Sequence, residues 1–452
     1  MTELLKTLCA LPGPSGCEDA VREFVLKKAR PFADEIKTDA IGNVMVFRKG
    51  KTALERPVVV CAHMDEVGVI VKKITEDGMI KFGFVGGVDP RVVIGRAVRF
   101  GEVTGVIGIK AVHLTTAAER RTMPKTKDLY IDIGATSRAA AEAKISLGDY
   151  GVFDSAVIEF GDGLIKAKAI DDRVGCAALL TLLEEQPPID TWFCFTVQEE
   201  TGLRGAASMA YALDPGFALV LEGTTAADLA EVTDGKAVCR VRGGVVLPFM
   251  DGATIYDAAL FELLRDACEK RGIPWQTKTR ISGGTDAGRI HKSRAGVRVC
   301  AAAAPVRYIH SPSSVAAVSD CEAVLAAARA FLEELLEIES IADADGGTHQ
   351  ELTQGKHHDH QDQERHRAQD VDGKVEHLHH RAGQGAHAVL LPRHQDNAQD
   401  NAQDAGHQSG RHGGVDGVPD TSLELLPQGL VGEGLAHLLH KFIHGSRAPP
   451  PR

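Results

Sequence analysis

The segment PVVVCAHMDE, residues 57–66, decides the fold class of this chain. Its residues 57–62 are apolar without any polar alternation, which is typical of a strand covered on both faces within a parallel sheet. His63 and Asp65 follow at the point where that strand ends. In open α/β sheets, ligands bind outside the carboxyl ends of the strands, so we expect these two side chains to face a site.

Acidic or imidazole side chains also follow four other predicted strands. They are Asp171 and Asp172 after strand 164–170, Glu199 and Glu200 after strand 191–198, Glu222 after strand 217–221, and His310 shortly after strand 297–303. Because the carboxyl ends of the strands meet at one edge of the sheet, we expect these residues to converge although they are far apart in the sequence. Convergence, rather than spacing, is the basis for predicting a site.

Residues 1–340 alternate short β-branched runs with longer amphipathic stretches. This pattern predicts an α/β fold with a mixed, largely parallel sheet flanked by helices. Within residues 69–163 it changes to short Val/Ile-rich runs broken by glycine, which indicates a small β-rich domain. We therefore expect a discontinuous α/β domain of residues 1–68 and 164–340, with residues 69–163 inserted. The segment 314–336 is predicted to be its closing helix.

Residues 341–452 differ in composition from the rest of the chain. They hold 15 of the 19 histidines, one aromatic residue and no cysteine. Residues 341 to about 420 have too few large apolar side chains to offset the entropy of ordering the chain, so we expect disorder. Two hypotheses remain for this tail: a His-rich segment that loads metal, or a segment translated from a shifted or wrong reading frame. The repeat DNAQDNAQ at residues 396–403 favours the second.

Composition narrows the possible classes of function. The net charge of −11 argues against a nucleic-acid partner, which needs a basic surface. No apolar run approaches the ~18 residues of a membrane span, and residues 1–11 lack the pattern of an export signal. We expect no membrane partner and a cytoplasmic location. The nine cysteines form no CxxC pair, which predicts reduced core residues without disulfides.

The residue types at the strand ends point to metal chemistry. Two imidazoles and several carboxylates in one crevice would be costly to desolvate unless cations compensated them. A nitrogen and oxygen set without cysteine suits two divalent ions, zinc above all, with cobalt or manganese as alternatives. A two-metal site activates water near pH 7. Glu199 and Glu200 leave their strand in different directions, one towards a metal and one towards the water, so amide hydrolysis is the natural reaction.

Each motif also has a purely structural interpretation. Taken alone, the pair Asp171-Asp172 before a helix is more often an N-cap, and Glu199-Glu200 after a strand is usually a solvated turn. The glycine-rich loop 283–288 lacks the Lys-Ser/Thr of a phosphate loop, so we interpret it as a substrate-facing loop. Its candidate substrate contacts are Gly284, Thr285 and Asp286.

The chain resembles a known family from residue 5 to about residue 336. The motifs that carry the resemblance are PSGCE at 14–18, DAIGN at 39–43, AHMDEVG at 62–68, DLYIDIGA at 128–135, IDDR at 170–173, QEETGLRGA at 198–206, GTDAG at 284–288 and PVRYIHS at 305–311. In this order they are similar to those of the glutamyl aminopeptidase or tetrahedral aminopeptidase family, whose members use two cocatalytic metal ions. The resemblance implies a zinc-peptidase type of fold. The implied metal ligands are His63, Asp171 as the bridge, Glu200, Glu222 and His310.

The same resemblance implies that Glu199 is the general base and acid and that Asp65 orients His63. It also implies that the inserted domain makes dimer contacts, that dimers assemble into a hollow dodecamer, and that substrates are short peptides with a free amino terminus. Two other functions stay open. One is a glycosidase, because some relatives carry a glucanase label; the other is a catalytically silent assembly whose oligomer is blocked by the tail.

Overall fold

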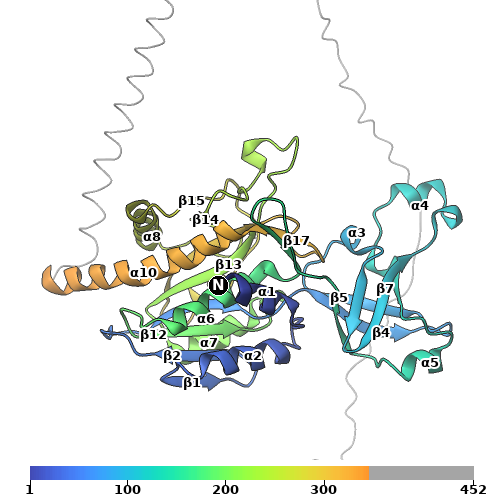
Figure 1. The fold of residues 1–452 in the computed structure, drawn as a ribbon, viewed down its shortest axis with the longest axis horizontal. Helices are drawn as coiled ribbons and strands as arrows, with labels where there is room; N and C mark the ends of the chain where they lie inside the picture. Colours follow the sequence, from blue (N-terminus) through green and yellow to red (C-terminus); the bar gives the residue numbers. More distant parts are fainter. Residues whose placement is uncertain (346–452) are drawn as a thin grey trace, which may run out of the picture. The chain divides into compact units, whose positions relative to one another are not determined.

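A computed structural model describes residues 1–345 and contains an eight-stranded sheet (Figure 1). Across the sheet the strands are β1 (Glu35–Thr38), β2 (Val44–Arg48), β12 (Thr191–Thr196), β3 (Val58–His63), β13 (Phe217–Thr225), β16 (Arg298–Val306), β14 (Val245–Val246) and β15 (Trp275–Gln276). Neighbours among β12, β3, β13 and β16 pair in parallel, whereas β1–β2, β2–β12 and β14–β16 pair antiparallel. The prediction of a mixed α/β fold is confirmed.

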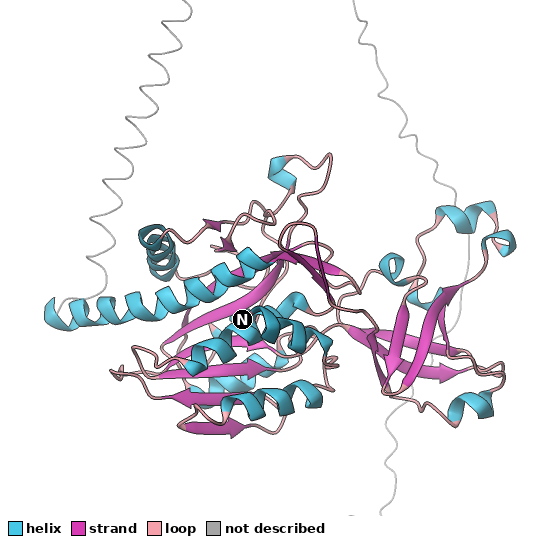
Figure 2. Cartoon of the chain, in the orientation of Figure 1, coloured by secondary structure: helices cyan, strands magenta, loops and turns pink. Residues whose placement is uncertain are grey.

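The packing of strand β3 on both of its faces explains why its apolar run is continuous. Its residues are all buried and alternate between two cores, with Val58 and Val60 in one and Val59 and Cys61 in the other. Helices lie on both faces of the sheet (Figure 2). The first core includes residues of α1 (Thr2–Ala10), α2 (Asp19–Ala29), α6 (Ile170–Glu184), α8 (Ala258–Arg271) and α10 (Val318–Asp345). The second includes residues of α7 (Arg204–Leu213) and α9 (Ala287–Ile290).

Between β3 and α6 the chain forms a closed barrel. Its strands, in order around the barrel, are β4 (Gly68–Ile74), β5 (Ile80–Val85), β8 (Leu129–Asp132), β7 (Val103–Ile109), β6 (Ala97–Phe100) and β9 (Tyr150–Phe153). Three short helices accompany them: α3 (Pro90–Val93), α4 (Ala117–Arg121) and α5 (Arg138–Glu142). The barrel has a hydrophobic core of its own. Glycine is needed where it packs tightly, because a Cβ on Gly151 would lie 2.6 Å from the Phe100 ring.

Three strands form a separate antiparallel sheet, in the order β10 (Ile158–Phe160), β11 (Leu164–Ala167) and β17 (Ser314–Ala317). Two predictions are wrong here. The predicted strand 164–170 ends at Ala167 and lies outside the eight-stranded sheet, because it pairs with β10 and β17. The start of the predicted helix 314–336 is strand β17, whose four buried residues carry no helical period.

Helix α10 begins at Val318 and continues to Asp345, past the domain boundary predicted at residue 340. The rest of the predicted disordered tail, residues 346–452, lies outside the described residues. Within residues 1–345, no helix combines the length and apolarity needed to cross a membrane.

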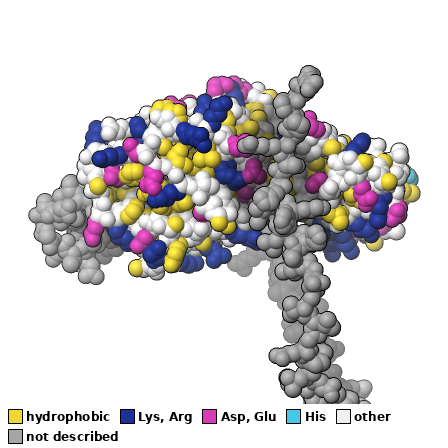
Figure 3. All heavy atoms as spheres, turned by 90° about the horizontal axis from the view of Figure 1, so that it is seen from below, with side chains coloured by type: hydrophobic (Ala, Val, Ile, Leu, Met, Phe, Trp, Pro, Cys, Tyr) yellow, Lys and Arg dark blue, Asp and Glu magenta, His cyan; other side chains and the backbone are white. Residues whose placement is uncertain are grey.

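The nine cysteines are free, and all except Cys17 are buried. On the face shown in Figure 3, acidic and basic side chains are interspersed with apolar ones. The strongest concentration of buried acidic groups lies instead at the carboxyl end of β3 and its neighbours, and this end of the sheet holds the candidate site.

Candidate metal centre

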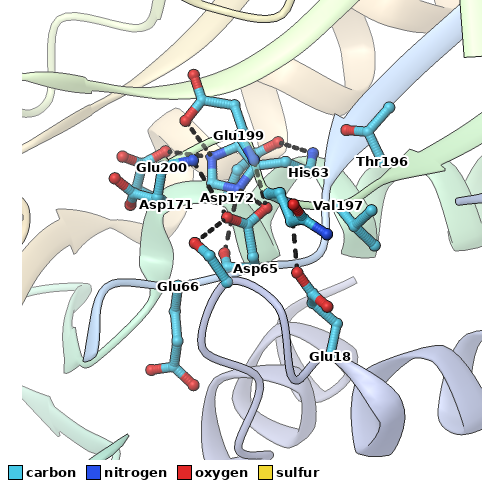
Figure 4. Close-up of polar contacts among 12 residues, drawn as sticks. Glu18, His63, Asp65, Glu66, Asp171, Asp172, Thr196, Val197, Glu199 and Glu200 are labelled. Carbon is cyan, nitrogen blue, oxygen red and sulfur yellow. Dashed lines mark hydrogen bonds and ion pairs between the residues drawn. The ribbon is translucent and has the colours of Figure 1, made fainter. Parts of the chain in front are cut away.

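The metal ligands expected from the sequence come together at one edge of the sheet, and Figure 4 shows three of them, His63, Asp171 and Glu200. His63 is the last residue of β3, Glu222 lies within β13, and Glu200 follows β12. His310 lies beyond the end of β16, and Asp171 lies in the first turn of α6. They form two groups: one from His63, Asp171 and Glu222, the other from Asp171, Glu200 and His310. Within each group the ligand atoms lie within 4.8 Å of one another.

Asp171 is common to both groups, and each of its carboxylate oxygens faces one imidazole. Its Oδ1 lies 3.3 Å from His63 Nε2, and its Oδ2 lies 3.3 Å from His310 Nε2. Each imidazole also meets one glutamate. Glu222 Oε1 lies 3.2 Å from His63 Nε2, and Glu200 Oε2 lies 3.2 Å from His310 Nε2. A carboxylate thus stands between two positions, each flanked by one histidine and one glutamate.

Asp171 reaches this edge from a helix rather than from a strand of the main sheet. Helix α6 packs against β3 and β13, and the Asp171–Asp172 peptide bond is cis. Asp172 is differently engaged: its Oδ1 accepts a hydrogen bond from the Gly175 N–H at 2.8 Å, and its Oδ2 accepts one from the His63 N–H at 3.2 Å. The capping interpretation therefore fits Asp172, while Asp171 faces the centre.

Asp65 connects His63 to the segment that carries the two adjacent glutamates. Its Oδ1 accepts a hydrogen bond from the Glu199 N–H at 3.0 Å. Its Oδ2 accepts hydrogen bonds from the Glu200 N–H at 3.1 Å and from Ser15 Oγ at 2.5 Å. His63 Nδ1 lies 3.5 Å from Asp65 Oδ1 but 3.1 Å from the Asp65 carbonyl oxygen. The carbonyl is the nearer acceptor, and a proton on Nδ1 leaves the Nε2 lone pair facing the carboxylates.

The centre is buried and acidic. Burial raises the pKa of Glu200 and of Glu222 to about 8 and raises the pKa of Glu199 well above its usual value. Burial also opposes ionisation of Asp171, but the neighbouring imidazoles of His310 and His63 lower the pKa of its carboxyl. No lysine or arginine within residues 1–345 forms an ion pair with these four acids; their ion pairs are with histidine.

The donor set fits divalent cations. Buried carboxylates that the protein itself does not neutralise require positive charge from elsewhere, and nitrogen with oxygen donors suits zinc and similar ions. Glu222 Oε2 is buried and has no hydrogen-bond partner among the described atoms. Such an atom needs an explanation in a folded protein, and a cation held by Glu222 supplies one.

Glu199 stands beside the ligand groups without belonging to either. Its Oε2 lies 4.0 Å from His63 Nε2, and its side chain lines a cavity of about 230 Å³ that the ligand groups also line. The two adjacent glutamates therefore have different surroundings, Glu200 in a ligand group and Glu199 at the cavity wall.

Two of the three predicted substrate contacts line this cavity, namely Gly284 and Thr285. Asp286 does not line it. Asp286 is buried and accepts a hydrogen bond from Thr196 Oγ1 at 2.5 Å. Its carboxylate therefore lies within the protein rather than on the cavity wall.

Sequence reasoning missed other residues of the cavity wall. They include Thr224 and Thr225 at the end of β13 and Lys278 just after β15. The two threonines stand two and three residues after Glu222 in the same strand, so the end of that strand was a usable signal. Lys278 belongs to no motif, and only the folded path of the loop after β15 brings it to the cavity.

A larger depression of about 600 Å³ lies where β13 and β16 begin, at the opposite end of these strands. Both of its arginines are paired with aspartates: Arg298 Nε donates to Asp257 at 2.8 Å, and Arg56 Nη2 donates to Asp214 at 3.0 Å. Neither group of candidate metal ligands lies there. The chemistry therefore belongs to the smaller cavity.

Comparison with known proteins agrees with this site. A family model described as M42 glutamyl aminopeptidase matches residues 42–326. The lysyl aminopeptidase of Pyrococcus furiosus is 32% identical over 343 residues, which cover 74% of this chain and 97% of that protein. The glutamyl aminopeptidase of Lactococcus lactis is 30% identical over 329 residues, which cover 70% of this chain and 91% of that protein.

Solved structures share the fold. The TET aminopeptidase of Thaumarchaeota archaeon SCGC AB-539-E09 has a TM-score of 0.70 and 34% identity, covering 73% of this chain and 95% of that one. A Thermotoga maritima protein described as an endoglucanase has a TM-score of 0.62 and 34% identity, and the match covers 74% of this chain and 98% of that one. The TET1 peptidase of Pyrococcus horikoshii has a TM-score of 0.65 and 31% identity, and the match covers 73% of this chain and 98% of that one. That protein is described as able to assemble into a tetrahedron or a large octahedral shell.

Proposed function

The chain belongs to the M42 glutamyl aminopeptidase family, and we propose that its buried centre uses two divalent ions to hydrolyse the amino-terminal peptide bond of short peptides. Membership makes the protein an aminopeptidase, a hydrolase of peptide bonds that depends on divalent metal. The observation that carries the proposal is Asp171, whose two carboxylate oxygens each face a histidine and glutamate pair. Zinc is the favoured metal for this donor set, with cobalt or manganese as alternatives.

The ligand groups assign the residues that would hold each ion. The first ion would be held by His63, Asp171 and Glu222, and the second by Asp171, Glu200 and His310. When bound, the ions would polarise the scissile carbonyl and lower the pKa of a water towards neutrality.

We assign proton transfer to Glu199. Its carboxylate would accept the proton of the attacking water and donate it to the leaving amine as the peptide bond breaks. The support is its place at the cavity wall outside both ligand groups. Asp65 would hold Glu199 through its backbone N–H and would orient His63. Gly284 and Thr285 would contact the peptide from the opposite wall segment.

The test is the Glu199→Gln variant, compared with the wild type in release of the amino-terminal residue from short peptides in the presence of zinc. Loss of the general base should lower kcat by about 10²- to 10⁴-fold. The matched control is Glu269→Gln, on the exposed face of α8, which should retain wild-type activity. Full activity of Glu199→Gln would contradict the assignment. A wild-type protein with intact metal binding that cleaves no peptide would instead favour the silent assembly.

The glycosidase alternative is not supported. The endoglucanase description belongs to a protein with the same fold and 34% identity to this chain, and that label is a mislabel within an aminopeptidase fold. Glycoside hydrolysis also uses a pair of carboxyl groups flanking the glycosidic bond, whereas here imidazoles stand among the carboxylates.

We propose that residues 69–163 form a dimerisation domain and that dimers assemble into a dodecamer. Large apolar side chains are exposed in this region, among them Val112, Leu114 and Met123, and such surfaces are frequently interfaces. The assembly described for the Pyrococcus horikoshii relative supports a higher-order state. Light scattering on the full chain tests the proposal, because a monomer would contradict it. We place the protein in the cytoplasm, where its free cysteines stay reduced.

A further inference from the structure

Among its described lining residues, the cavity beside the metal centre has one lysine, Lys278, and no arginine. The metal-binding part of the wall carries Asp171, Glu222 and His310. Glu199 also lines the cavity, and the remaining residues are small, hydroxyl-bearing or apolar, such as Thr225, Ser282 and Ile309. The cavity is smaller than the ~300 Å³ lower bound of typical sites for drug-sized ligands. It has the size to take one side chain of a peptide next to the scissile bond.

Lys278 is held in place through its neighbours in the chain. It lies two residues after the end of β15 and is half-buried. The Thr279 N–H donates a hydrogen bond to the Val238 carbonyl at 2.8 Å, which fixes the loop against the segment after β13. Burying the stem of a lysine while its ammonium reaches a cavity is a common use of this side chain.

The ammonium of Lys278 has no carboxylate partner within residues 1–345. The buried Lys168 shows the contrast, because its Nζ donates to both oxygens of Glu66 at 2.7 and 2.9 Å. A partly buried charge that the protein leaves unpaired is available to a ligand of opposite charge.

We propose that Lys278 makes this cavity select peptides whose first residue is glutamate or aspartate. The inference rests on the proposed function and deepens it, because relatives named as lysyl and as glutamyl aminopeptidases show that family membership leaves the preferred residue open. A substrate carboxylate would receive a charge-assisted hydrogen bond from Lys278, with the hydroxyls of Thr225 and Ser282 nearby. A substrate whose first residue is lysine would bring a positive charge next to Lys278, and this repulsion adds discrimination against basic residues.

The test compares kcat/KM for peptides that begin with Glu, Gln or Lys, using the full chain loaded with zinc. Glu and Gln have nearly the same shape, so their ratio isolates the charge. The wild type should favour Glu over Gln by about tenfold or more, and Lys278→Met should lower that ratio by about tenfold or more. Lys278→Glu should reverse the order and favour Lys over Glu.

The matched control is Arg280→Met, which removes a positive charge from the same loop at an exposed residue that does not line the cavity. It should change the Glu to Gln ratio by less than about threefold. A wild type that prefers Gln or Lys, or a Lys278→Met variant with an unchanged ratio, would overturn the inference while leaving the aminopeptidase function standing.

A binding measurement separates this inference from the proposed function. Calorimetry with zinc-loaded Glu199→Gln would compare free glutamate with free glutamine, and repeat the comparison in Glu199→Gln/Lys278→Met. Tighter binding of glutamate that disappears with Lys278 supports the inference even if no peptide is hydrolysed. Equal binding of the two amino acids to Glu199→Gln overturns it even if hydrolysis is confirmed.

Discussion

Two buried groups of charged residues lie side by side in this protein and balance their charge in opposite ways. The first is the metal centre. The second, which we call the ion-pair cluster, consists of Glu66, Lys168 and Arg173, all at most 3% exposed. Glu66 accepts from Lys168 Nζ at 2.7 Å and from the Gly13 N–H at 3.0 Å, and Arg173 Nη2 lies 3.5 Å from its Oε1. Other donors of the two cations reach backbone carbonyls, such as Arg173 Nη1, which donates to that of Leu8 at 2.6 Å, while Arg173 Nε has no partner among the described atoms.

The two groups use adjacent residues of the same segments. Asp65 belongs to the surroundings of His63, whereas Glu66 points away from them towards the ion-pair cluster (Figure 4). In the same way, Asp172 contacts His63 of the metal centre, whereas the next residue, Arg173, contacts Glu66 of the ion-pair cluster. The ion-pair cluster sets two cations of its own against one carboxylate, but the metal centre offers only imidazoles to its carboxylates. The balance of charge, rather than the number of buried charges, therefore distinguishes a site that needs added cations from a structural cluster.

Removal of metal should separate the two groups most sharply. Treatment with a chelator should lower peptidase activity to below about 1% of that of the zinc-loaded protein, because water is no longer activated at neutral pH. Returning zinc should restore it. The far-ultraviolet circular dichroism should change little, since the ion-pair cluster contains its own cations. Activity that survives exhaustive chelation would contradict the metal centre.

Removal of the only acid of the ion-pair cluster should act on stability instead. Glu66→Gln leaves Lys168 and Arg173 buried beside a neutral amide, and breaking such a buried pair costs about 3 to 5 kcal/mol of unfolding free energy. Chemical denaturation of the zinc-loaded protein measures the loss. The matched control is Glu185→Gln, whose pair with Arg329 is about half-exposed and should be worth less than about 1 kcal/mol. Equal losses in the two variants would show that Glu66 is not the centre of a buried cluster.

Asp65→Asn should mainly lower metal affinity and activity, whereas the neighbouring variant Glu66→Gln should mainly lower stability. The carboxylate of Asp65 accepts from the Glu199 and Glu200 N–H groups and lies near His63 Nδ1. Changing a group that orients metal ligands typically lowers metal affinity or activity by about 10- to 100-fold. Competition with a chromophoric chelator measures zinc affinity directly. If Asp65→Asn lowered stability but left zinc affinity unchanged, its proposed orienting role would be wrong.

The sequence reveals the metal centre better than it reveals the cavity beside it. His63 and Glu222 could be placed because a buried strand is a local pattern, and the residue at its carboxyl end must lie at the edge of the sheet. Asp171 lies at the predicted edge, although the strand from which it was predicted belongs to another sheet: β11 pairs with β17, about 150 residues away in the chain. Such pairing depends on contacts distant in the sequence, which an apolar run does not encode.

Loop residues were predicted less well for the same physical reason. Asp286 stands in a glycine-rich loop that predicts exposure, yet Thr196 from the sheet holds its carboxylate inside the protein. Lys278 follows a strand of two residues and carries no pattern of its own. Their positions are set by side-chain contacts with distant segments, so they became visible only in the folded chain.

A mostly buried pair outside the metal centre should give the smallest effect and complete the comparison. Asp228 accepts hydrogen bonds from Arg307 Nε at 2.7 Å and Nη2 at 2.6 Å, and this pair anchors the segment that leads from β16 to His310. Burial alone would raise the pKa of Asp228, but the hydrogen bonds from Arg307 lower it. A carboxyl with a lowered folded pKa adds stability above its unfolded pKa of ~3.9 and loses that stability as the pH falls through the folded value.

Asp228→Asn should therefore be less stable than the wild type at pH 7, by about 1 to 2 kcal/mol, because the pair is mostly buried but the amide oxygen of asparagine can still accept one hydrogen bond from Arg307. The gap should persist to about pH 5 and shrink below about pH 4, where the wild-type carboxylate takes up its proton. Denaturation curves of both proteins without metal at pH 7, 5 and 3.5 measure the gap and keep the titration of the metal ligands common to both. A gap that widens in acid would mean that the neutral carboxyl is the form that the fold stabilises, and the ion pair would then contribute nothing.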